Sequence, residues 1–234
     1  IGADPEGDKP FAPEIVDTFE TGFKSELLDN ELRLNASLFY SDYSDMQVTV
    51  QRAASNDNFV ARVVNAGAAE IKGIELETAY MLSDNLTMNA GMGWLDAKFI
   101  EFNDTDVTTG ELVNKADERV VSNTPEFSAN IGLSYDISAD IGDFLITTNL
   151  SHRGATHIFE VESDLDEDAY SLMNIGINYF HPDGQWTASL QAKNVFDKEY
   201  RVAGYNFKGL GGDDSIIGYY GDPRTIALTV GYRF

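Results

Sequence analysis

The sequence predicts an all-β fold, an antiparallel up-and-down transmembrane β-barrel segment of about nine strands. Two observations predict it. Alternation of period two recurs along the chain and gives each segment one apolar face and one small or polar face. Short turns also alternate with long loops along the 234 residues, and transmembrane barrels sort their connections in this way. No segment has helical periodicity.

The nine predicted strands share this alternation and differ mainly in length. The segment 127–137 is the clearest, with Phe127, Ile131 and Tyr135 on its apolar face and Ser128 and Asn130 opposite. The predicted strands are 18–28, 32–50, 72–82, 86–102, 127–137, 144–153, 171–181, 186–194 and 224–234.

The last strand places Ile226, Leu228 and Val230 on one face, and the chain given stops on Phe234. An aromatic residue at the end of an alternating strand resembles the C-terminal strand of bacterial outer-membrane proteins. That resemblance implies that Tyr232 and Phe234 form a signal for the barrel-assembly machinery.

The connections fall into two classes. Short turns are predicted near residues 29, 84, 140 and 183, where Asp, Asn, Gly and Pro gather. Residues 1–13 read as a loop, and the long loops between strands are 53–66, 103–123, 154–169 and 201–222. The long loops are therefore the predicted extracellular side, and the short turns are the predicted periplasmic side.

Aromatic residues gather on the apolar faces near the predicted short turns. Transmembrane barrels carry such girdles where the membrane meets water. The predicted membrane girdle consists of Tyr80, Tyr135, Phe144, Tyr179, Trp186 and Tyr232.

Composition excludes several classes of protein. No run approaches the roughly 20 apolar residues of a membrane helix. Cysteine is absent, which excludes disulfides and thiolate sites. A net charge of -23 disfavours nucleic acid as a partner. No catalytic motif is present, so the sequence predicts neither an enzyme nor a bound cofactor.

The acidic stretch 160–168 offers the candidate ligand-binding residues. Asp164 and Asp166 begin like a calcium loop, but Ala169 and Ile175 stand where an EF-hand needs Gly and Glu. No resident metal site is therefore predicted. Either a looser calcium site or a solvated acidic loop fits the pattern. The loop candidates for ligand contact are His157, Asp164, Asp166, Asp213 and Asp214.

Charged residues also occur on the polar faces of the predicted strands. A charge enclosed in a barrel needs a partner, so these residues are expected either to pair across the wall or to contact a domain inside it. They are Arg33, Glu75, Glu77, Lys193 and Arg233.

Several stretches resemble the C-terminal barrel of TonB-dependent outer-membrane receptors. They span the chain from about residue 10 onward. They are DTFETGFKSE (17–26), RLNASLFYSDY (33–43), NAG with IKGIELE (65–67 and 71–77), NVFDKEY (194–200) and GDPRT (221–225).

The resemblance implies a plugged, 22-stranded transporter in the outer membrane of a Gram-negative bacterium. It implies uptake of a scarce small-molecule ligand, such as a ferric siderophore, with energy from the TonB complex. Residues 1–234 would be the C-terminal part of this barrel, because the plug domain and the early strands have no counterpart here. The partners would be those missing parts, the assembly machinery, and lipid or lipopolysaccharide.

Two other functions remain open on the sequence. A passive pore or an adhesin-like barrel would lack a plug. An acidic β domain in solution, binding calcium or carbohydrate, would bury the apolar faces between two layers.

Overall fold

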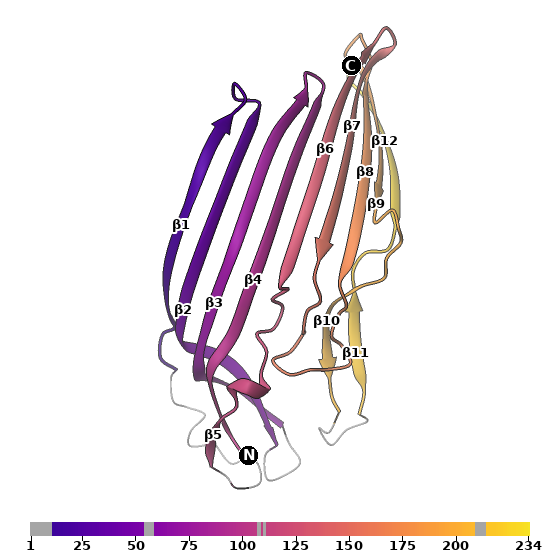
Figure 1. The fold of residues 1–234 in the computed structure, drawn as a ribbon. Helices are drawn as coiled ribbons and strands as arrows, with labels where there is room; N and C mark the ends of the chain where they lie inside the picture. Colours follow the sequence, from indigo (N-terminus) through magenta and orange to yellow (C-terminus); the bar gives the residue numbers. More distant parts are fainter. Residues whose placement is uncertain (1–10, 54–58, 107–108, 110, 209–213) are drawn as a thin grey trace.

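The computed structural model describes residues 11–53, 59–106, 109, 111–208 and 214–234. Nine strands follow one another in chain order across one antiparallel sheet (Figure 1). They are β1 (Ile15–Leu27), β2 (Leu32–Ala53), β3 (Phe59–Ser83), β4 (Leu86–Thr105), β6 (Phe127–Ala139), β7 (Gly142–Arg153), β8 (Tyr170–Phe180), β9 (Trp186–Lys193) and β12 (Thr225–Tyr232). The predicted fold class and the nine-strand path are therefore confirmed.

Three further strands and a short turn of helix lie within the predicted loops. β5 (Leu112–Asn114) pairs with β4, and β10 (Arg201–Asn206) pairs with β11 (Ile216–Tyr220) as a separate hairpin. The 3₁₀ turn η1 (Ala116–Glu118) follows β5. The prediction of plain loops over 103–123 and 201–222 is wrong in these places, because the segments are too short for their alternation to stand out.

The first of the predicted long loops, 53–66, is also largely strand. β2 runs to Ala53 and β3 begins at Phe59, so the predicted loop 53–66 contributes to a long hairpin. Register shifts near Met46 and Ala69 change the phase of the alternation along this hairpin. A shift of phase hides a strand from a period-two pattern, which explains the error.

All four short turns and the C-terminus lie at one end of the sheet (Figure 1). Leu28, Asp29 and Asn30 have φ of 53°, 52° and 74° in the first of these turns. Asn and Asp tolerate this left-handed region because their side chains bond locally. The predicted turn positions are confirmed, and this end is called the short-turn end below.

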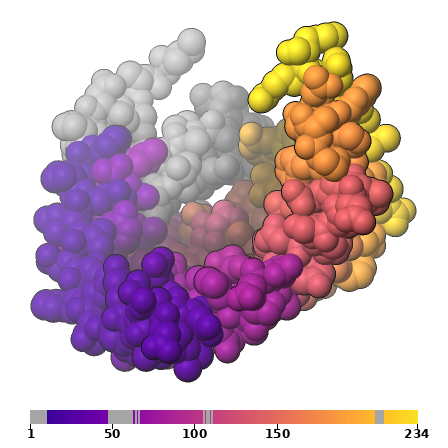
Figure 2. Space-filling model, turned by 90° about the horizontal axis from the view of Figure 1, so that it is seen from above, coloured from indigo at the N-terminus to yellow at the C-terminus, as the bar shows by residue number. Residues whose placement is uncertain are grey.

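The sheet is a single curved layer. Seen along the strands, it forms an open arc around a hollow (Figure 2). In β12, Ile226, Leu228 and Val230 are 60–71% exposed, and no large side chain of the described residues is fully buried. The alternative of two stacked layers is therefore wrong. The apolar face is called the outer face below, and the polar face the inner face.

The apolar part of the outer face ends at different heights on the first four strands. On β1 and β2 the rows from Leu27 to Phe19 are mostly apolar, with only the small polar residues Thr21 and Ser25 among them. On β3 and β4 the row of Phe19 already holds the ion pair of Lys72 and Asp96, so the apolar part ends one row earlier there. Eight residues at about 3.3 Å each give about 26 Å along the strand, comparable to the apolar band of about 25 Å on membrane barrels. The row beyond that of Phe19 is charged throughout and consists of Asp17, Asp42, Glu70 and Lys98.

Few side chains of the described residues are buried, and those on β2 to β4 and η1 lie beyond this band. Phe99 and Phe102 meet edge to face at 5.1 Å and pack with Ala69 and Ala116. η1 is thereby held against the ends of β3 and β4. No helix in the described residues is long and apolar enough to cross a membrane.

Candidate functional site

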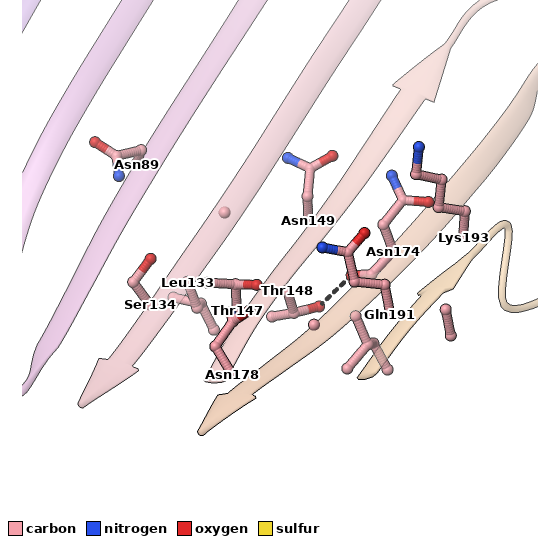
Figure 3. Close-up of a pocket in the computed structure, with 14 residues that line it drawn as sticks. Asn89, Leu133, Ser134, Thr147, Thr148, Asn149, Asn174, Asn178, Gln191 and Lys193 are labelled. Atoms are coloured by element: carbon pink, nitrogen blue, oxygen red, sulfur yellow. Dashed lines mark hydrogen bonds between the residues drawn. The ribbon is translucent and has the colours of Figure 1, made fainter. Parts of the chain in front are cut away.

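A hollow of about 270 Å³ lies on the inner face of β4 and β6 to β9 (Figure 3). One row of opposed residues crosses it, from Asn89 through Gly132 and Asn149 to Asn174. Gly132 adds no side chain there, so the carboxamides border a depression. Lys193 is the one charged residue that lines it. Carboxamides both donate and accept hydrogen bonds, so this surface suits a polar partner.

A second hollow, of about 380 Å³, lies on the inner face of β1 to β3 and is acidic. Glu20, Glu75 and Glu77 line it together with Lys24. The inner face therefore changes from acidic on the first strands to neutral on the later ones.

Within the described part of the chain, the expectation that inner-face charges pair across the wall is confirmed for one of the predicted residues, Arg33. Arg33 Nη2 lies 3.3 Å from Glu26 Oε1, and both side chains are more than half exposed. Glu77 instead accepts a long hydrogen bond, 3.5 Å, from the amide of Asn35. Exposed pairs contribute at most about 1 kcal/mol, so these charges do little to hold the sheet together.

At the opposite end from the short turns, the connection 154–169 binds the β10–β11 hairpin. Glu167, 7% exposed, accepts hydrogen bonds from the backbone N–H and from Nε of Arg201, at 3.0 and 2.9 Å. Leu165, 3% exposed, packs on Gly204 so closely that a Cβ there would lie 2.6 Å from its Cδ1. The hairpin and this connection therefore form one packed unit, called the loop unit below.

The predicted ligand residues of the acidic stretch have partners within the loop unit. His157 Nδ1 lies 2.7 Å from Asp166 Oδ2, and the backbone N–H groups of Ser163 and Ile158 donate to the same carboxylate at 3.0 and 3.2 Å. Burial raises the pKa of Asp166, but these hydrogen bonds outweigh it and hold the pKa below its usual value. Asp164 pairs with Lys208.

Within the acidic stretch Asp166 and Glu167 are thus bonded inside the loop unit, whereas Glu162, Asp164 and Asp168 are exposed, as expected for a solvated loop. Among the described residues no three Asp, Glu or His side chains gather as a metal site. Asp214 also has a partner, and Asp213 lies outside the described residues. None of these residues is shown to contact a ligand.

The aromatic residues predicted as a girdle lie on the outer face near the short-turn end. Trp186 opposes Tyr232, with ring centroids 4.6 Å apart, and Phe144 opposes Tyr179 at 5.1 Å. Tyr80 on β3 is partly buried and Tyr135 on β6 is 44% exposed. Phe234 contacts Tyr232 edge to face at 5.0 Å.

Residues 1–195 match the family model described as "TonB dependent receptor-like, beta-barrel". The chain belongs to the TonB-dependent receptor β-barrel family. This receptor barrel segment has the single curved sheet, polar inner face and apolar outer face described above, and the resemblance drawn from the sequence motifs is confirmed.

Relatives of this receptor barrel include siderophore receptors. The ferric-pyoverdine M114 receptor PbuA of Pseudomonas sp. (strain M114) is 25% identical over 224 residues, covering 93% of this chain and 24% of that protein. The pesticin receptor of Yersinia pestis is 23% identical over 197 residues, covering 84% and 26%. The chain therefore spans about a quarter of the length of these relatives.

Among solved structures, the ferric yersiniabactin uptake receptor FyuA from Yersinia pestis superposes with a TM-score of 0.74. It is 21% identical, and the match covers 97% of this chain and 31% of that one. This similarity supports the fold of the receptor barrel.

Sequence reasoning missed the residues that organise the loop unit. Glu167 looked like one acid in an acidic run, and Arg201 stood at the border of a predicted loop. Glu167 and Arg201 lie 34 residues apart in the sequence, so no local sequence pattern relates one to the other. The stretch 194–200 was noticed as a motif, but its structural role was not predicted.

Proposed function

We propose that this chain supplies part of the wall and external ligand-binding connections of an outer-membrane receptor for a scarce ligand such as a ferric siderophore. TonB would energise uptake, and the plug domain and remaining strands of the same protein would complete the barrel. The observation that carries the proposal is membership of the TonB-dependent receptor family, in which the named relatives include ferric siderophore receptors.

The two faces of the sheet support a place in the membrane. The outer face is apolar over a height that fits a bilayer, and its aromatic residues gather at the short-turn end. Trp and Tyr favour the boundary between lipid and water because their rings are amphipathic. The girdle of Tyr80, Tyr135, Phe144, Tyr179, Trp186 and Tyr232 would therefore lie at the periplasmic boundary, with Tyr232 and Phe234 read by the assembly machinery.

The polar side chains of the inner face favour a barrel filled by a polar domain over an empty channel. Carboxamides and hydroxyls line the later strands, and carboxylates line β1 to β3. A plug domain with basic residues toward β1 to β3 would satisfy these carboxylates. Ligand capture would fall to the external connections, where the loop unit offers a preorganised surface.

Uptake of a labelled ferric siderophore tests this function. A strain that lacks the full-length gene is compared with the same strain carrying it, under iron restriction and with a panel of ferric siderophores. We expect gene-dependent uptake of at least one siderophore, abolished by loss of TonB or by collapse of the proton gradient. No gene-dependent uptake of any ferric siderophore in the panel would contradict the proposal.

Bilayer conductance separates a receptor from the pore alternative. A plugged receptor reconstituted without TonB is expected to pass little current. A steady conductance from the full-length protein would favour a passive pore.

A further inference from the structure

The connection from β9 to β12 begins and ends with two segments that bind each other, residues 194–200 and 221–224. Together they are called the clasp. They coincide with two motifs noticed in the sequence, NVFDKEY and GDPRT. We propose that the clasp fixes the register of the terminal strand β12 against β9.

Asn194 is the centre of the clasp. It is 4% exposed, and its Nδ2 donates to the carbonyl oxygens of Lys198 and Asp222 at 2.9 and 3.1 Å. Its Oδ1 accepts from the backbone N–H of Lys198 at 2.9 Å. Both donors and the acceptor of one buried carboxamide are therefore used, and one bond crosses between the two segments.

A second set of bonds joins Asp197 to Arg224. The backbone N–H of Arg224 donates to Asp197 Oδ1 at 2.9 Å, and the two side chains approach to 3.6 Å. Arg224 Nη1 also donates to the carbonyl of Val195 at 3.4 Å. Because Arg224 immediately precedes β12, these bonds fix where the strand begins.

The close approach of Gly221 to Tyr200 closes the clasp. The N–H of Gly221 donates to the carbonyl of Tyr200 at 2.9 Å, and a Cβ at Gly221 would lie 2.0 Å from the tyrosine Cζ. A larger residue there would displace the ring of Tyr200.

The clasp is also fixed to the wall. The backbone N–H of Asn194 donates to Asn174 Oδ1 at 3.0 Å, and that of Val195 donates to the carbonyl of Met173 at 2.8 Å. Asn174 and Met173 belong to β8. The hydrogen bonds of the clasp therefore position the start of β12 relative to two strands: β9, which the clasp directly follows, and β8, to which it is bonded.

The need for such a lock follows from the alternation itself. A slip of one residue would turn every side chain to the wrong face, but a slip of two would restore the faces. Leu190 opposes Leu228, and after such a slip it would oppose Ile226 or Val230, which are equally apolar. The hydrophobic pattern therefore does not distinguish these registers.

The register of β12 is fixed neither by the connection from β9 nor by a second neighbouring strand among those described. A two-residue turn fixes register in a hairpin, but β9 and β12 are joined by the long connection 194–224. Among the described strands β12 pairs only with β9, whereas β6, β7 and β8 each have two neighbours. In a closed barrel the register of this strand helps to set the stagger of the whole wall.

Cysteine pairs report the register directly, because the chain has no native cysteine. Leu190→Cys with Leu228→Cys reports the native register, and Leu190→Cys with Ile226→Cys or Val230→Cys reports a slip of two residues. A disulfide needs Cα atoms within about 7 Å, which favours opposed residues over diagonal ones. The full-length protein is oxidised in outer membranes, the folded heat-modifiable form is isolated, and the linked peptides are identified by mass spectrometry.

With the clasp intact we expect the native cross-link to dominate. Asp197→Ala removes the acceptor of the Arg224 N–H, and loss of one such bond shifts an equilibrium about fivefold. The ratio of slipped to native cross-link should therefore rise by about that factor. Glu26→Ala is the matched control, because it removes an exposed cross-strand ion pair elsewhere and should leave the ratio unchanged.

An unchanged ratio in both Asp197→Ala and Asn194→Ala would overturn the proposal. If Asp197→Ala yields no folded barrel, the cross-link ratio is measured in Arg224→Gln instead. That variant keeps the bond from the backbone N–H of residue 224 to Asp197 and loses the ion pair. A raised ratio in that variant supports the lock, and a native ratio contradicts it. The inference rests on the barrel architecture, so failure of siderophore uptake would leave it standing.

Discussion

The first and second halves of the wall extend beyond the apolar band in different ways. β2 and β3 have 22 and 25 residues and continue as a ladder to the pair Ala53 and Phe59. β7, β8, β9 and β12 have between 8 and 12 residues. Beyond these shorter strands the chain is held by side chains of the loop unit and the clasp. A backbone ladder needs few special residues, whereas the second arrangement depends on a few buried polar groups.

The largest expected effect lies in the second half. Glu167→Ala leaves Nε and the backbone N–H of Arg201 without their acceptor, while Nη1 keeps only the carbonyl oxygen of Asp164. Breaking a buried ion pair costs about 3–5 kcal/mol. Hydrogen exchange should therefore rise across 154–169 and 201–208 while the barrel strands stay protected. Gln47→Ala, on the β2–β3 hairpin, should change exchange far less. Equal protection in Glu167→Ala and the parent protein would remove the contrast between the halves.

A somewhat smaller effect is expected where the two halves are alike, on the outer face of the band. Ile74 opposes Leu38 and Trp94 there. Ile74→Lys should cost about 2–4 kcal/mol, as for a cation at the middle of a barrel's lipid face. Urea unfolding of the full-length protein in lipid vesicles measures this. The control is Ser134→Lys on the inner face of β6, where Ser134 opposes Thr87 and Thr147; it should unfold near the parent concentration. A larger cost for Ser134→Lys than for Ile74→Lys would reverse the assignment of the faces.

Acidity should loosen the loop unit before the ladder of the first half. The folded state lowers the pKa of Asp166. Its stabilising contribution is therefore complete above the unfolded value of about 3.9 and is lost as the pH falls through the folded pKa. Protease cleavage within 154–169 should stay slow near neutral pH and accelerate in strong acid. Asp166→Asn should be cleaved faster at neutral pH and show a weaker acid response. If the cleavage rate of Asp166→Asn depended on pH as that of the parent does, protonation of Asp166 would not be the cause of the acid response.

The smallest effect is expected for the exposed pair of Arg33 and Glu26. Arg33→Ala should change the free energy of unfolding by less than about 1 kcal/mol, because both side chains are screened by water. The same urea titration measures it. A loss as large as that of Ile74→Lys would mean that this pair is enclosed in the complete protein.

The fold could be predicted from the sequence because the membrane imposes one rule on every strand. Segments such as 127–137 alternate cleanly, and their short turns carry Asp, Asn or Gly. The prediction failed over 59–66, where the strand rises beyond the band and bulges shift its phase. No bilayer constrains either face there, so the pattern that identifies a strand is lost.

The candidate site was less predictable for a different reason. His157 and Asp166 were selected for their chemistry, and they do meet, but as parts of a bonded loop rather than as shown ligand contacts. The contacts between Glu167 and Arg201 and between Asn194 and Asp222 join distant segments. Such contacts depend on how the long connections pack against one another beyond the strand ends, and this packing produces no periodic pattern in the sequence.

The central claim is that the outer face meets lipid and the inner face meets water or protein. Leu228 and Thr229 are adjacent on β12 and point to opposite faces. Each is replaced by cysteine in the full-length protein and labelled with a fluorophore, and quenching by nitroxide-bearing lipid is measured in vesicles. The account predicts strong quenching at Leu228→Cys and little at Thr229→Cys. Equal quenching at both positions, or the reverse order, would contradict it.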